Sequence, residues 1–271
     1  MNNTDFEFIR QFIKTEAAIV MEPGKEYLVE SRLMPIAVEE GLVTLEALVK
    51  EMKFKPTESL KFKVIDALTI NETLFFRDIH PFDALKNEIL PAVLLKKQKE
   101  KRLNIWCAAS SSGQEPYTIA MILKDQWADL EGWTINFIAS DISDKMIARA
   151  REGIYNQMEV NRGLPMPYLL KYFQKVGSNW QINKEIRDMV KFQKINLMNS
   201  WAFPPMDFVF MRNVLIYFNV ETKKEIFDRV EKTLDPEGYF FLGGSETTLG
   251  VSNRFERIGI NRVPCYQLKK S

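Results

Sequence analysis

From residue 103 onward, short apolar runs alternate with amphipathic segments of helical periodicity, and this alternation leaves few folds open. Strands are predicted at residues 103–107, 134–139, 190–195, 208–211 and 239–242, and helices at 116–127, 144–151 and 221–234. Strands joined in this way run parallel, and right-handed crossovers place the helices on both faces of the sheet. The sequence therefore predicts an α/β fold with a mostly parallel sheet.

The first part of the chain follows a different pattern. Residues 1–70 carry apolar side chains at helical spacing, as at Phe6, Ile9 and Ile13, and show no alternating strand pattern. Thr44 is a typical N-cap residue for one of the helices. We therefore expect a small all-helical domain of about four helices ahead of the α/β domain.

A second departure lies between residues 165 and 191. The stretch PMPYLLKYF predicts a short helix, and the residues around Gly177 and Asn183 predict small strands. We interpret this segment as a small β-type insertion, with an antiparallel flap. The expected organisation is a helical domain over 1–70 and an α/β domain over 71–271 that carries the insertion.

Composition narrows the classes of partner and cofactor. A net charge of +1 disfavours nucleic acid and anionic membrane surfaces as partners. Cys107 and Cys265 lie in apolar stretches and are expected as buried thiols; with a single histidine they form no recognisable metal-ligand cluster. The first residues, MNNTDFEFIRQF, lack the order of a signal peptide, and no apolar run approaches membrane-spanning length, so a cytoplasmic protein is expected.

The stretch NIWCAASSSGQEPY, residues 104–117, reads as a strand, a turn of small residues and a helix start, which is where α/β proteins bind nucleotides. The turn has one glycine, Gly113, and no lysine, so it lacks the usual features of a phosphate site. An adenosine ligand without phosphate, such as S-adenosylmethionine, fits better. Glu115 at the helix start and Asp141 after the next strand can accept hydrogen bonds from such a ligand. The alternative is that Ser110–Ser112 and Asp141 only cap helices.

Three further sequence motifs resemble those of a known protein family. NETLFFRD (71–78), KINLMNS (194–200) and FMRNVLIYF (210–218), taken with WCAASSSGQEPYTIA and ASDIS, closely resemble the CheR family, which methylates glutamates on bacterial chemotaxis receptors. The blocks follow the family's order from about Asn71 to the C-terminus, and the helical N-terminal region is similar more weakly. The resemblance implies a Rossmann-like class I methyltransferase domain that uses S-adenosylmethionine and releases S-adenosylhomocysteine.

The resemblance also implies a set of site residues. Cofactor contacts would be Asn71, Thr73, Arg77, Glu115, Asp141, Asn196, Leu197, Arg212 and Asn213. Asp141 would hold the ribose, and Asn196 and Leu197 would flank the adenine, whereas Tyr217 would face the reacting centre. The implied substrate is the set of cytoplasmic methylation helices of chemoreceptors, and the enzyme is expected as a monomer with no nucleic-acid partner and no insertion into the membrane.

The implied chemistry agrees with the residues present. A glutamate carboxylate, with a reference pKa of about 4.3, is ionised near neutrality and needs no general base. The only histidine, His80, is expected to pack at a helix start, and no nucleophile–histidine constellation is apparent. A buried carboxylate does need a compensating donor, for which Tyr217 is our candidate. Arg77 can assist Tyr217 or bind the cofactor's own carboxylate.

Two other classes of protein are possible on such a fold. A signalling or scaffold protein on a methyltransferase fold would bind the cofactor without turnover, but such a protein has no physical need for the full set of site residues. A nicotinamide-dependent oxidoreductase would need the glycine fingerprint that the turn after the first strand lacks.

Overall fold

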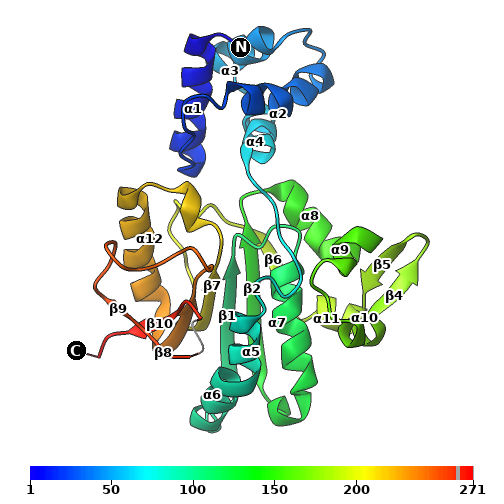
Figure 1. Ribbon diagram of the computed structural model, residues 1–271, viewed down its shortest axis with the longest axis vertical. Helices are drawn as coiled ribbons and strands as arrows, with labels where there is room; N and C mark the ends of the chain where they lie inside the picture. The colour runs from blue at the N-terminus through cyan, green and yellow to red at the C-terminus, as the bar shows by residue number, and fades with distance from the viewer. Residues whose placement is uncertain (261–262, 271) are drawn as a thin grey trace.

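The computed structural model describes residues 1–260 and 263–270, and it places a helical region on top of an α/β region (Figure 1). The helical region contains α1 (Asn3–Ala17), α2 (Glu26–Glu39), α3 (Leu45–Phe54) and α4 (Glu58–Leu68). Its apolar side chains form a core of their own, which includes Phe6, Ile9 and Ile13. Thr44 caps α3 as predicted, since its hydroxyl accepts a hydrogen bond from the backbone of Ala47 at 3.2 Å.

A seven-stranded sheet forms the centre of the α/β region, in the order β6-β2-β1-β7-β8-β10-β9. Its strands are β1 (Arg102–Ala108), β2 (Thr134–Asp141), β6 (Lys191–Lys194), β7 (Met206–Met211), β8 (Leu234–Phe241), β9 (Phe255–Arg257) and β10 (Cys265–Leu268). The first five pair in parallel, whereas β10 runs antiparallel to both β8 and β9. The five predicted strands are all present, and β9 and β10 were not predicted.

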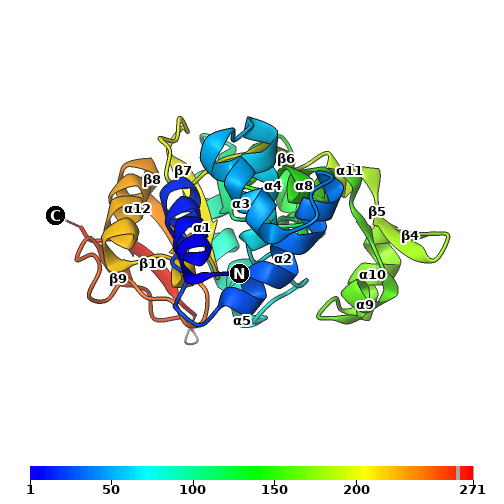
Figure 2. The same cartoon turned by 90° about the horizontal axis from the view of Figure 1, so that it is seen from above.

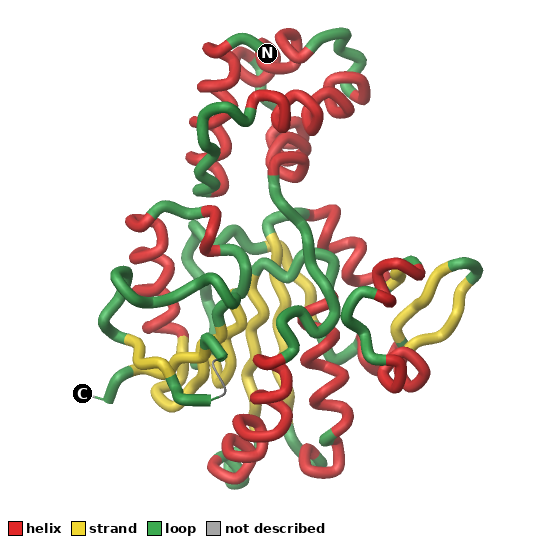
Figure 3. The backbone as a smooth tube through the Cα atoms, viewed as in Figure 1, coloured by secondary structure: helices red, strands yellow, loops and turns green. Residues whose placement is uncertain are grey.

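Helices cover both faces of this sheet, as Figure 3 shows by colour. They are α5 (His80–Ala84), η1 (Leu85–Ile89), α6 (Leu90–Lys96), α7 (Gln114–Asp125), η2 (Trp127–Leu130), α8 (Asp144–Glu152) and α12 (Val220–Thr233). Side chains of β1 alternate between the two layers: Ile105 and Cys107 join the core beneath α7, and Trp106 joins the core beneath α12. Burial on both faces explains why these strands read as continuous apolar runs.

The insertion forms a small antiparallel sheet of order β3-β5-β4, flanked by short helices. Its elements are β3 (Ile154–Tyr155), α9 (Gln157–Asn161), α10 (Met166–Tyr172), β4 (Phe173–Val176), β5 (Asn179–Ile182) and α11 (Lys184–Arg187). Gly177 makes the hairpin turn with φ +59. Because β3 pairs with β5, the sheet draws in residues ahead of the range expected from the sequence. Phe75 joins the sheet to the main domain through edge contacts with Tyr155 and Phe173.

The carboxyl ends of the parallel strands point toward the helical region. Seen from above, α1 projects beside α12 and β7, while α4 projects beside α8 and β6 (Figure 2). Cys107 and Cys265 are free and buried, as predicted, and burial raises the pKa of both thiols. Within residues 1–260 and 263–270, no helix is long and apolar enough to cross a bilayer.

Candidate active site

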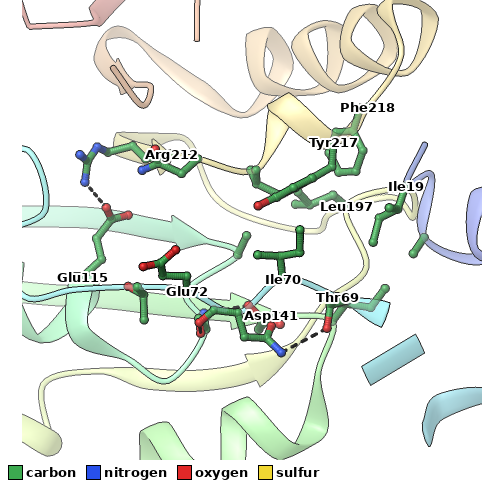
Figure 4. A pocket seen from close by; sticks show the side chains of 18 of the residues that line it. Ile19, Thr69, Ile70, Glu72, Glu115, Asp141, Leu197, Arg212, Tyr217 and Phe218 are labelled. Carbon is green, nitrogen blue, oxygen red and sulfur yellow. Dashed lines mark hydrogen bonds and ion pairs between the residues drawn. The ribbon is translucent and has the colours of Figure 1, made fainter. Parts of the chain in front are cut away.

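A cavity lies between the carboxyl edge of the sheet and the helical region (Figure 4). Every residue predicted for the site lines it: Asn71, Thr73, Arg77, Glu115, Asp141, Asn196, Leu197, Arg212, Asn213 and Tyr217. These residues come from the segment before α5, from the first turn of α7, from the end of β2, from the loops after β6 and β7, and from the short helix η3 (Leu215–Tyr217). Their individual roles stay predictions, and the local geometry shows what each side chain is free to do.

The turn after β1 forms the floor of the cavity. Ala109, Ser111 and Gly113 all have left-handed backbone, with φ of 51, 47 and 95. The turn is held to β2, because Ser110 donates its N–H to the carbonyl of Ser140 at 2.8 Å. A Cβ on Gly113 would come within 3.1 Å of the Ala150 side chain, so the tight approach of α7 to α8 also favours glycine there. Ala109 and Ser111 both line the cavity.

The structure does not support the alternative that Ser110–Ser112 and Asp141 only cap helices. The N-cap of α7 is Gly113, with no side-chain cap, and the N-cap of α8 is Ser143, whose hydroxyl accepts from Met146. Asp141 instead accepts backbone N–H bonds from Ser111 at 2.8 Å and Ser143 at 2.9 Å. Burial raises the pKa of Asp141, and these two backbone bonds oppose that rise. The carboxylate is thus held in a fixed orientation at the cavity wall, with lone pairs left for ligand hydroxyls.

Arg212 ties three parts of the site together. Its guanidinium is fully buried and forms an ion pair with Glu115 in the first turn of α7. It also donates to the carboxylate of Asp78 and to the carbonyl of Arg77, both at 2.8 Å. Its Nε atom is buried and has no hydrogen-bond partner among the described residues. Glu115 receives one more bond, from the thiol of Cys107 at 3.2 Å. Much of the hydrogen-bonding capacity of Arg212 is therefore used inside the protein.

Tyr217 directs its hydroxyl into the cavity (Figure 4). Among residues 1–260 and 263–270 this hydroxyl has no hydrogen-bond partner, so it is available to a ligand. Burial raises the pKa of Tyr217, against an opposing effect of the Arg77 charge, so the phenol is a neutral donor at physiological pH. Arg77 itself donates to the carbonyl of Glu72 at 3.0 Å. The neighbouring acid Asp78 binds Arg212 instead of Arg77.

The helical region supplies a wall of the cavity that sequence reasoning missed. Ala17 and Ile19, at the end of α1, line the cavity opposite the sheet. The side-chain amide of Asn196 donates to the carbonyl of Glu16 at 2.7 Å, and its oxygen accepts from the backbone of Met198. The amide of Asn196 thus fixes α1 against the domain below. Nothing in the sequence around Ile19 indicated this role, because the contact joins segments far apart along the chain.

The sequence is similar to a known protein family over both of its regions. Residues 71–263 match the family model described as the CheR methyltransferase SAM binding domain, and residues 4–69 match its all-alpha domain. The chain belongs to the CheR methyltransferase family. A chemotaxis protein methyltransferase of Pseudomonas putida is 38% identical over 98% of both chains, and one of Pseudomonas aeruginosa is also 38% identical over 98% of both. One of Vibrio parahaemolyticus is 35% identical over 99% of this chain and 98% of its own.

Membership in the CheR family confirms the resemblance, the fold class and the prediction of an S-adenosylmethionine-dependent methyltransferase in chemotaxis. The cavity fits that cofactor. Ile19, Ile70 and Leu197 provide apolar wall suited to an aromatic base, and the carboxylate of Asp141 stands at the end of β2. The positive charge of Arg212 and the acid Glu115, which both line the cavity, match a ligand that carries a carboxylate and an ammonium group.

Proposed function

We propose that this enzyme methylates glutamate side chains on the cytoplasmic methylation helices of chemoreceptors and forms glutamate methyl esters. One observation carries the proposal: the unbonded hydroxyl of Tyr217 points into the cavity that Asp141 and Glu115 also line. A neutral phenol in that position suits an incoming carboxylate, which needs a hydrogen-bond donor when it leaves water.

The bound cofactor supplies an electrophilic methyl group on a sulfonium, and the carboxylate nucleophile arrives ionised, since its reference pKa is about 4.3. The protein's tasks are therefore alignment and exclusion of water rather than proton removal. Tyr217 donates to one carboxylate oxygen and leaves the other free to react. Arg77 adds positive charge at the same edge of the cavity, where it lowers the cost of bringing the anion in.

The remaining site residues each bind a different part of the cofactor. Asp141 accepts hydrogen bonds from the two ribose hydroxyls, and Glu115 accepts from the ammonium group. Arg212 would place positive charge beside the cofactor carboxylate. Leu197 and the backbone of Asn196 border the adenine, because the amide of Asn196 is already bonded to Glu16. Asn71, Thr73 and Asn213 complete the walls.

The same proposal covers the setting of the reaction. The substrate is a protein, the cytoplasmic part of a chemoreceptor, and the enzyme acts in the cytoplasm as a monomer without nucleic acid. A binding-only scaffold is disfavoured, because the free hydroxyl of Tyr217, directed into the cavity, would have no use without turnover.

The test combines purified enzyme, S-adenosylmethionine labelled in the methyl group, and cytoplasmic fragments of chemoreceptors. We expect label on the fragment that is released as methanol by mild base, which identifies a methyl ester. Fragments with alanine in place of the methylated glutamates serve as the control and should take up no label. Base-stable label would contradict ester formation, and binding of S-adenosylhomocysteine without any transfer would favour the scaffold.

A further inference from the structure

The carboxylate of Glu246 lies against the backbone of the loop that follows β7. Its Oε1 accepts the N–H groups of Val214 at 2.9 Å and Leu215 at 2.7 Å, and its Oε2 accepts those of Asn213 at 2.8 Å and Gly243 at 2.7 Å. Glu246 is only 7% exposed and is not among the residues that line the cavity. One buried side chain therefore binds three successive N–H groups of this loop and a fourth from its own turn.

These N–H groups need such an acceptor. Residues 213–215 lead into η3, and the first N–H groups of a helix have no partner within it. Asn213 adopts left-handed backbone, with φ of 59, which turns the chain sharply after Arg212. A carboxylate forms stronger hydrogen bonds than a neutral acceptor, so Glu246 holds this turn more firmly than water or a carbonyl would.

Gly243 makes the close approach possible. A Cβ on this residue would lie 2.7 Å from the side-chain oxygen of Asn213 and 2.8 Å from Oε2 of Glu246. Both distances are shorter than real contacts of a Cβ, so any larger residue would displace one of the two side chains. Gly243 and Glu246 thus both hold the loop 213–215 in place, and a substitution at either residue should disturb that loop.

The loop held by Glu246 carries Arg212, Asn213 and Tyr217, all of which line the cavity. Tyr217 follows directly, since its N–H bonds to the carbonyl of Val214 at 3.2 Å. We propose that Glu246 is a positioning residue for methyl transfer: it orients Tyr217 toward the substrate carboxylate without touching substrate or cofactor. The inference rests on the proposed role of Tyr217 and goes beyond it by naming what sets its orientation.

The first test is Glu246→Gln, which keeps the size of the side chain but turns an NH2 group toward backbone donors. We expect kcat for receptor methylation to fall about tenfold or more, because small misplacements of a reacting group are costly. The receptor KM and the stoichiometry of S-adenosylhomocysteine binding should change little. Asp207→Asn is the matched control, since Asp207 is also buried and accepts a backbone N–H, from Asn104 at 2.7 Å, near the start of β7. It should lower stability but leave kcat per bound cofactor unchanged.

A double-mutant cycle separates positioning from general damage. If Glu246 acts through Tyr217, the double variant Glu246→Gln/Tyr217→Phe should be no slower than the slower single variant. Gly243→Ala provides a second perturbation and should lower kcat in the same way, with rates counted per cofactor-binding site in every sample. If the wild-type enzyme is active and the Glu246 and Gly243 variants keep its kcat, the inference is wrong. It is also wrong if the fold-losses in kcat of the two single variants multiply in the double variant. An inactive wild type would instead refute the proposed function.

Discussion

The burial of the ion pair between Arg212 and Glu115 predicts how much unfolding free energy is lost when Arg212 is replaced. The guanidinium side chain is 0% exposed, and the Glu115 side chain is 11% exposed. The second partner, Asp78, is 46% exposed, so solvent screens that bond and it adds little. In Arg212→Leu the buried carboxylate of Glu115 loses its cation and, among the described residues, retains only the weak thiol donor of Cys107.

Removing one partner of a buried pair costs about 3–5 kcal/mol, which is a large part of the 5–15 kcal/mol that stabilises a typical domain. We expect Arg212→Leu to lose about this amount of unfolding free energy. Adding Glu115→Gln should restore part of the loss, because the stranded charge is then gone. Arg254→Leu is the control, since Arg254 is 69% exposed in its pair with Glu231 and should change stability little.

The assay is urea denaturation followed by tryptophan fluorescence. All five tryptophans lie beyond residue 100, so the signal reports on the methyltransferase domain and not on the helical domain. A loss below about 1 kcal/mol in Arg212→Leu would refute the reasoning, because it would place this pair in the range of exposed ones. A double variant less stable than Arg212→Leu would refute it equally.

Two further predictions concern other parts of the molecule. Burial opposes ionisation of Asp125, but hydrogen bonds from Lys171 and Tyr172 lower its pKa to about 2. Asp125→Asn should therefore lose about 1 kcal/mol at pH 7, and urea midpoints should converge with wild type as the pH falls from about 4 to about 2, where the carboxylate is protonated. Ile19→Ala should weaken S-adenosylhomocysteine binding about fivefold in calorimetry, since it removes apolar cavity wall. Val20→Ala should leave this binding unchanged, because Val20 is 38% exposed and does not line the cavity.

Features that depend on local pattern were predictable from the sequence. β1 is buried on both faces, β2 is buried toward its carboxyl end, and apolar runs of strand length predict both strands. Asp141 and the turn at 109–113 could be placed together, because the carboxyl ends of neighbouring parallel strands meet at one edge of a sheet. The family motifs placed the remaining residues at the same cavity.

Features that depend on contacts between distant segments were not predictable. β8 begins at Leu234, five residues before the predicted start, because Pro236 and Gly238 interrupt the strand pattern. The wall formed by Ile19 and the bond from Asn196 to Glu16 join parts of the chain about 180 residues apart. No local signal marks such a contact, so only the folded chain reveals it.

The role of Glu246 was not predictable either, because its four backbone donors come from two separate turns. Its sequence surroundings, GGSETT, read as an ordinary turn. The physical reason for an acid at this position appears only when the unpartnered N–H groups ahead of η3 are brought next to it.

Titration calorimetry of S-adenosylhomocysteine into Asp141→Ala and Tyr217→Phe tests the division of the cavity into a cofactor side and a substrate side. The account predicts that Asp141→Ala weakens binding at least about tenfold, since the hydrogen bonds to the ribose are lost. Tyr217→Phe should bind as tightly as wild type, within about twofold. Equal loss of binding in the two variants would contradict this division.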